Sequence, residues 1–135
     1  MSYSLTEIDG IDEETIKVLK SCGIRSTERF LETAKTAKGR KDLAAKTGLE
    51  EKQLLRWANV ADQLRIKGIG EDYAELLREA GVNTVRELKF RNATRLARAI
   101  AAANAKRGLV KLPPSEKAVA RWIEQAKKLP LKITY

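Results

Sequence analysis

The amino-acid sequence predicts an all-α protein of roughly nine or ten short helices. Apolar residues recur at helical spacing, as in Tyr73, Ala74, Leu76, Leu77 and Ala80. The alternation of β-branched and polar residues that is typical of strands is absent from the sequence. An internal repeat is the third observation, and it predicts that the helices form two similar units.

The repeat becomes visible when the chain is aligned with itself. The segment "IDGIDEETIKVLKSCGIRSTERF" at 8–30 aligns with "IKGIGEDYAELLREAGVNTVREL" at 66–88. Further on, the pair Arg56-Trp57 aligns with Arg121-Trp122, and the second copy is longer around "AKRGLVKLPPSEK". We therefore expect a first unit over 1–62 and a second unit over 63–135, each with about four to five short helices.

In the first unit, periodicity predicts helices over 13–21, 26–37, 40–47 and 50–62. Trp57 and Trp122 hold equivalent places beside apolar neighbours, which predicts that both pack in the core. Cys22 aligns with Ala80, so we expect a small buried residue there. A single cysteine cannot form an internal disulfide, which fits a reducing, cytoplasmic location.

In the second unit, a helix over 71–80 should end at Gly81, because glycine readily adopts the left-handed conformation of a helix C-cap. Either Asn83 or Thr84 can cap the helix that follows. The Ala-rich segment 92–106 strongly favours a helix. The last helix should begin after two prolines, with Ser115 as its cap.

Several functional classes are disfavoured by composition. No apolar run approaches the ~20 residues needed to span a membrane, and the first ten residues do not resemble a signal peptide. The absence of histidine excludes His-based acid–base chemistry and the commonest zinc and iron sites. No phosphate loop, nucleotide fingerprint or paired-carboxylate constellation is present. We therefore expect a protein that is not an enzyme and holds no cofactor or metal.

The net charge of +9 lies entirely in the second unit. Residues 1–62 carry 11 basic and 11 acidic residues, whereas residues 63–135 carry 16 basic and 7 acidic ones. Such asymmetry is typical of a surface that binds a polyanion. A protein with a solvated lysine-rich face remains an alternative interpretation.

The segment "IKGIGEDYAELLREAGV" at 66–82 resembles the helix-hairpin-helix signature. The doubled unit, with its repeated tryptophans, resembles the bacterial tandem helix-hairpin-helix proteins of domain-of-unknown-function family 4332 over about 5–130. This resemblance implies two pseudo-repeated helix-hairpin-helix units and sequence-independent binding of duplex DNA. The resemblance places phosphate contacts at Gly68, Ile69 and Gly70, where glycines let the backbone approach closely. Lys67 lies inside the same loop and is a further candidate contact.

The two hairpins depart from that pattern in different ways. In the first, Asp12 replaces the second glycine, so we expect a carboxylate to take the place of a phosphate at the helix start. In the second, Glu71 and Asp72 follow the glycines and would oppose a phosphate, which favours a purely structural turn. Helix-hairpin-helix glycosylases add a catalytic Asp after the hairpin, but no Asp follows Asp72 in this sequence.

A second candidate site lies downstream, where no acidic residue occurs from 88 to 115. The i, i+4, i+7 spacing of Arg91, Arg95 and Arg98 predicts one stripe of the Ala-rich helix. Cations in such an array neutralise phosphates, but they also suit an acidic protein surface or anionic lipid. The basic candidates in this stretch are Lys89, Arg91, Arg95, Arg98, Lys106, Arg107 and Lys111.

The sequence thus predicts a binding module that contacts DNA or another nucleic acid weakly through its second unit. The alternative is a scaffold that binds an acidic protein, with both hairpins structural. DNA binding predicts that the loop Lys67–Gly70 and the arginine stripe lie on one face, whereas a scaffold permits them to point apart and predicts an apolar patch elsewhere.

Overall fold

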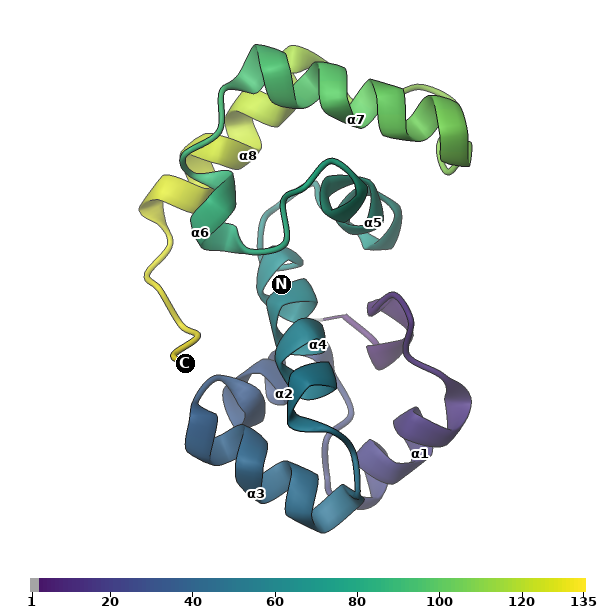
Figure 1. Ribbon diagram of the computed structural model, residues 1–135, viewed down its shortest axis with the longest axis vertical. Coiled ribbons are helices and arrows are strands. Elements are labelled where there is room, and N and C mark those ends of the chain that lie inside the picture. Colours follow the sequence, from purple (N-terminus) through teal and green to yellow (C-terminus); the bar gives the residue numbers. More distant parts are fainter. Residues whose placement is uncertain (1–2) are drawn as a thin grey trace.

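The computed structural model describes residues 3–135, and in that range the chain is all helical, as the sequence predicts (Figure 1). Within this described range, a short 3-10 helix precedes eight α-helices, and one isolated β-bridge joins Ser4 to Ser26. The 3-10 helix spans Leu5–Glu7, and the α-helices are α1 (Glu13–Ser21), α2 (Thr27–Ala34), α3 (Ala37–Thr47), α4 (Glu51–Gln63), α5 (Glu71–Glu79), α6 (Val85–Leu88), α7 (Ala93–Arg107) and α8 (Glu116–Lys128).

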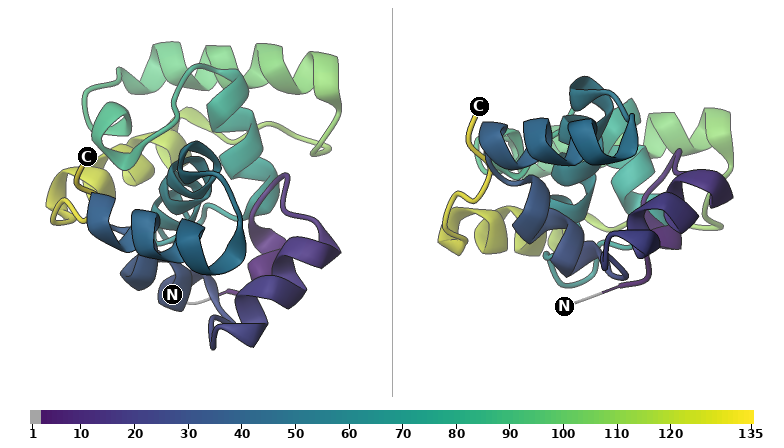
Figure 2. Two further views of the ribbon diagram at one scale, coloured as in Figure 1. Left: turned by 60° about the horizontal axis from the view of Figure 1, so that its bottom comes forward. Right: turned by 90° about the horizontal axis from the view of Figure 1, so that it is seen from below.

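The helices gather at two ends of the molecule, with α4 between them (Figure 1). Helix α2 packs against α3 and α4 at one end, while α7 packs against α5 and α8 at the other. Helix α6 contacts both α8 and α4. Figure 2 shows that the last residues of the chain return from α8 toward the end formed by α2 and α3. This return brings segments from opposite halves of the sequence into contact.

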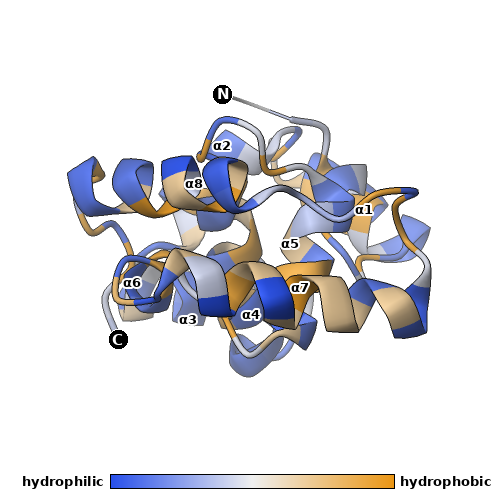
Figure 3. Cartoon of the chain, turned by 90° about the horizontal axis from the view of Figure 1, so that it is seen from above, coloured by the Kyte–Doolittle hydropathy of each residue, from blue (hydrophilic) through white to orange (hydrophobic). Residues whose placement is uncertain are grey.

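One hydrophobic core runs through both halves of the chain. It includes Phe30 and Leu54 from the first half together with Leu77 and Ile100 from the second. Hydrophilic and hydrophobic residues alternate along α7 and α8, as expected for helices with one buried side (Figure 3). The expected boundary after residue 62 falls in the last turn of α4, and the division into two repeated units stays a prediction.

Both tryptophans are buried as predicted, with 3% exposure for Trp57 and 4% for Trp122. Cys22 does not follow its prediction, because it is exposed at the C-cap of α1. The repeat alignment matched Cys22 with Ala80, which is itself only half-buried at the end of α5. The repeat alignment therefore predicts the position of Cys22 at the end of a helix correctly, but it does not predict its exposure.

Most helix ends lie where local capping chemistry predicts them. Thr84 and Ser115 accept hydrogen bonds from amides in the first turns of α6 and α8, and Gly81 is left-handed with φ of 91°. The junction of α2 and α3 was predicted wrongly, as a break between residues 37 and 40. Thr36 caps α3 by accepting a hydrogen bond from the amide of Gly39 at 2.9 Å. Gly39 is thus a helical residue, not a break.

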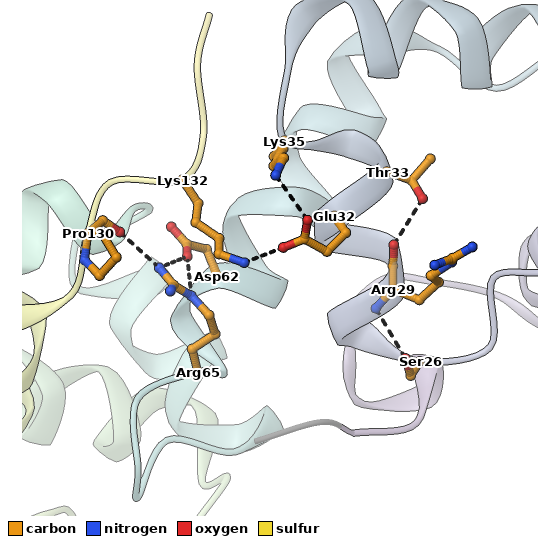
Figure 4. Close-up of polar contacts among 9 residues, drawn as sticks. All are labelled: Ser26, Arg29, Glu32, Thr33, Lys35, Asp62, Arg65, Pro130 and Lys132. Atoms are coloured by element: carbon orange, nitrogen blue, oxygen red, sulfur yellow. Dashed lines mark hydrogen bonds and ion pairs between the residues drawn. The ribbon is translucent and has the colours of Figure 1, made fainter.

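The C-terminal segment 129–135 ties α8 to α2 and α3. The amide of Thr134 donates to the Lys35 carbonyl at 2.8 Å, and the guanidinium of Arg40 donates to the Thr134 carbonyl at 2.6 Å. Lys132 forms an ion pair with Glu32, which is also paired with Lys35 (Figure 4). The end of the chain is therefore part of the fold.

Candidate functional site

The loop 66–70, predicted from its glycines to approach a phosphate, is fastened to α8. The amide of Lys67 donates to the Gln125 side-chain oxygen at 2.9 Å, and the Gln125 amide group donates back to the Lys67 carbonyl at 3.0 Å. Gly68 has φ of 100°, and a Cβ there would lie 2.9 Å from Nε1 of Trp122. The glycine therefore serves the packing of the loop on α8.

Two backbone amides of the loop already donate hydrogen bonds within the fold. The Lys67 amide bonds to Gln125, and the Ile69 amide donates to the Ile66 carbonyl at 3.1 Å. The side chain of Ile69 is fully buried. Only the amides of Gly68 and Gly70 remain as candidates within the loop.

Carboxylates surround the start of α5, next to this loop. A hollow of about 440 Å³ is lined by Glu7, Glu71 and Asp72 together with Gly68 and Gly70. The pKa of Glu71 is raised first by burial and then by the neighbouring carboxylates, of which Glu7 has the largest effect. A phosphate brought to the helix start would meet the same repulsion.

In the equivalent place of the first half, a carboxylate caps the helix as predicted. Asp12 accepts a hydrogen bond from the Thr15 amide at 2.8 Å. Hydrogen bonds from Thr15 lower the pKa of the Asp12 carboxyl, because they stabilise its charged form. The Asp12 carboxylate thus occupies the start of α1, in the place where the motif would bind a phosphate.

The basic candidates of the second half lie mainly on α7 and in the turn before it. Arg95, Arg98 and Lys106 are exposed, on the side of the helix opposite to the buried Leu96 and Ile100. Arg91, expected on this helix, instead lies in the turn that precedes the N-cap Asn92. The Asn92 side-chain oxygen accepts a hydrogen bond from the Arg95 amide at 3.0 Å. The helix therefore begins after Asn92 and does not include Arg91.

The turn also carries an exposed aromatic residue. Phe90 is 75% exposed, and the ammonium group of Lys89 lies 5.4 Å from the centroid of its ring. We call Lys89, Phe90, Arg91, Arg95, Arg98 and Lys106 the α7 surface.

Two other basic candidates are not counted in the α7 surface. Arg107 is paired with both Glu75 and Glu79 of α5, and the hydrogen bond with Glu75 is the largest cause of its raised pKa. Lys111 is exposed in the loop between α7 and α8. Arg107 therefore serves the packing of α7 on α5, and we remove it from the candidate interface.

Helix α7 differs from most other helices of the structure in the charge at its start. Helices α1, α2, α4, α5, α6 and α8 have an acidic residue in the first turn, whereas α3 and α7 have none. In α7 the first turn holds Arg95, where the helix dipole disfavours a cation by about 0.3–1 kcal/mol. The Glu116 carboxylate of α8, which accepts a hydrogen bond from the Thr94 hydroxyl in the same turn, offsets part of that cost.

The structure also brings together residues that the sequence did not connect. Lys67 and Gly68 line a cleft with Arg121 of α8, which was not among the predicted site residues. The repeated pairs Arg56-Trp57 and Arg121-Trp122 are a signal for this position, but the repeat by itself predicts only the packing of the tryptophans. The loop 66–70 is therefore connected to α8, while Arg95 and Arg98 stand on α7.

Comparison with known proteins gives a family but no activity. A model of the family described as "Domain of unknown function (DUF4332)" matches residues 9–129. No curated protein and no solved structure matches the chain. Within residues 3–135, the structure contains no helix with the length and apolar character of a membrane span.

Proposed function

The chain belongs to the DUF4332 family, and we propose that it is a non-enzymatic module that binds nucleic acid without sequence preference. The proposed interface is the α7 surface, not the loop 66–70. The observation that carries the proposal is the set of three arginines, Arg91, Arg95 and Arg98. None of the three makes an ion pair with another residue in the described part of the chain.

The energetics of such a surface favour a polyanion over a single small anion. Arginines held on a helix and its preceding turn can each neutralise one backbone phosphate and release the counterions condensed around it. Guanidinium groups bind phosphate oxygens through two parallel hydrogen bonds, which adds geometric fit to charge. Contacts to phosphates carry no sequence information, so the expected binding is general.

The turn before α7 adds a feature that backbone contacts do not require. Phe90 exposes most of its ring between two cations, Lys89 and Arg91. An unpaired base stacked on an aromatic ring contributes about 1–3 kcal/mol. We therefore expect single strands, or duplexes with frayed ends, to bind more tightly than a blunt duplex.

The test is fluorescence anisotropy with labelled duplex DNA, single-stranded DNA and RNA over a series of salt concentrations. The variant Arg91→Ala, Arg95→Ala, Arg98→Ala should bind more weakly. The slope of its log K against log salt concentration should be less steep by about 1 for each arginine that contacts a phosphate. A Phe90→Ala variant should lose affinity for single strands but little for duplex DNA.

The matched control removes three exposed cations from the first half, Lys20, Lys41 and Lys46, each replaced by alanine. It has the same change in net charge, so only a general electrostatic effect would weaken both variants equally. Equal weakening would contradict the assignment to α7. No binding to any of the three nucleic acids at low salt would contradict the proposal and leave an acidic protein as the partner to test.

A further inference from the structure

A cleft of about 600 Å³ lies outside the α7 surface, between the loop 66–70, α8 and the segment 112–115 that precedes α8. Tyr73 of α5 and Trp122 of α8 line it, with ring centroids 5.2 Å apart. Leu112, a residue that is 78% exposed, and Pro113 extend its apolar wall. The volume is in the range that small-molecule sites occupy, about 300–1,000 Å³.

The charged groups that line the cleft are all positive. They are Lys67 from the loop and Arg121 from α8, and no carboxylate is among the lining residues. Neither cation has an ion-pair partner among residues 3–135. The carboxylates Glu7, Glu71 and Asp72 line the neighbouring hollow instead.

Both cations are attached to backbone that other contacts hold in place. The double hydrogen bond with Gln125 fixes the backbone of Lys67 to α8. Arg121 precedes the buried Trp122 and stands one turn before Gln125 on the same helix. The two charges therefore share one rigid support, and a ligand would not have to order the backbone that carries them.

We propose that this cleft binds a phosphate monoester carried on an organic body, such as a mononucleotide or the phosphorylated end of a strand. A phosphate monoester carries about −1.5 to −2 charges at pH 7, which matches two unpaired cations. A carboxylate or a phosphodiester carries about −1 and would leave one cation without a partner. The apolar wall beside the cations suits the organic part of the ligand.

This inference does not rest on the α7 surface, because the cleft shares no residue with it. The two proposals can therefore fail separately. If the protein binds mononucleotides but no long strand, the proposal for the cleft holds and the proposal for the α7 surface is contradicted.

The test is isothermal titration calorimetry with deoxyadenosine 5′-monophosphate and with deoxyadenosine. We expect the monophosphate to bind at least about tenfold more tightly, since charge-assisted hydrogen bonds supply the difference. The variants Lys67→Ala and Arg121→Ala should each weaken the binding of the monophosphate by about tenfold. Both residues are exposed, and circular dichroism will verify that the variants stay folded.

The control variant Arg95→Ala, Arg98→Ala lies on the α7 surface and should leave the affinity for the monophosphate within about twofold. A second arm compares a single-stranded DNA decamer with and without a 5′-phosphate. Preference for the phosphorylated decamer, lost in Arg121→Ala, identifies strand ends as the source, whereas preference for the monophosphate alone identifies a free nucleotide. Equal affinity for monophosphate and nucleoside, or equal weakening by the α7 variant, would overturn the proposal.

Discussion

At the scale of single residues, a left-handed glycine in the loop 66–70 allows the loop to pack closely on α8. Gly68 is left-handed and lies against the ring of Trp122, so its missing side chain makes room for α8. Gly10, its counterpart in the sequence repeat, is also left-handed and lies against the guanidinium of Arg56. Gly70 has φ of −104° and no atom near the position of a Cβ. The two glycines of the loop therefore have different tolerances to substitution.

A Gly68→Ala variant should destabilise the protein. Its Cβ would meet the indole of Trp122, and a left-handed alanine costs about 1–2 kcal/mol. We expect a loss of about 1–3 kcal/mol in the free energy of unfolding, measured by urea denaturation.

Gly70→Ser is the matched control in the same loop. Serine at this N-cap position can accept a hydrogen bond from the first turn of α5, so stability should change by less than about 1 kcal/mol, in the stabilising direction. A larger loss for Gly70→Ser than for Gly68→Ala would show that the loop is not held by Trp122 and Gln125.

At the scale of the elements, the junction of α2 and α3 depends on a buried cation. Arg40 is 5% exposed and donates to the Ala34 carbonyl at 2.9 Å, at the end of α2, and to the Thr134 carbonyl. It thereby satisfies one carbonyl that the end of α2 leaves without a helical partner. The same side chain joins two helices to the C-terminal segment.

The Arg40→Ala variant should lose about 2–3 kcal/mol of unfolding free energy, because two hydrogen bonds from a charged donor disappear and two carbonyls lose their partner. The amide of Thr134 should then exchange faster with solvent, since its bond to the Lys35 carbonyl depends on the position of the segment. Urea denaturation and hydrogen exchange measure the two effects. Lys41→Ala, at the exposed neighbouring position, should change stability by less than about 0.5 kcal/mol. Unchanged exchange at Thr134 in Arg40→Ala would contradict this role.

Local chemistry explains which parts of the fold were predictable from the sequence. Helix caps act within one helical turn, so the sequence alone identifies Ser115 and leaves two candidates, Asn83 and Thr84, for the cap of α6. The contacts of Lys132 with Glu32 and of Lys67 with Gln125 join residues far apart in the chain, and no local pattern encodes them. The same limit applies to the site, because the cleft at Arg121 exists only where three segments meet.

At the scale of the whole molecule, the C-terminal segment connects the two ends through an ion-pair cluster around Glu32 (Figure 4). Lys132, and then Lys35, lower the pKa of the Glu32 carboxyl from 4.5 to about 2. A carboxyl whose pKa is lower in the folded state stabilises the fold above pH 4.5, and this contribution is lost as the pH falls toward 2. The cluster therefore connects the attachment of the segment to acid stability.

The Lys132→Ala variant should raise the pKa of Glu32 toward 4.5 and flatten the decrease of stability between pH 4.5 and pH 2. Carbon-detected NMR titration of the Glu32 carboxyl measures the first effect, and urea denaturation at several pH values measures the second. In Lys127→Ala, which removes an exposed pair with Glu124, the pKa of Glu32 should stay unchanged. An unchanged pKa in Lys132→Ala would mean that the segment does not contact α2 in solution.

The continuous core predicts that both halves unfold together. Each half holds one buried tryptophan, so Trp57→Phe and Trp122→Phe variants give one fluorescent probe per half. Within each variant, the urea midpoint from fluorescence should coincide with that from far-UV circular dichroism, as in a two-state transition. Phenylalanine in place of Trp57 removes no hydrogen bond, since the Trp57 Nε1 has no partner within the described chain. A fluorescence midpoint that differs from the circular dichroism midpoint within either variant would show that segments 1–62 and 63–135 unfold independently despite the shared core.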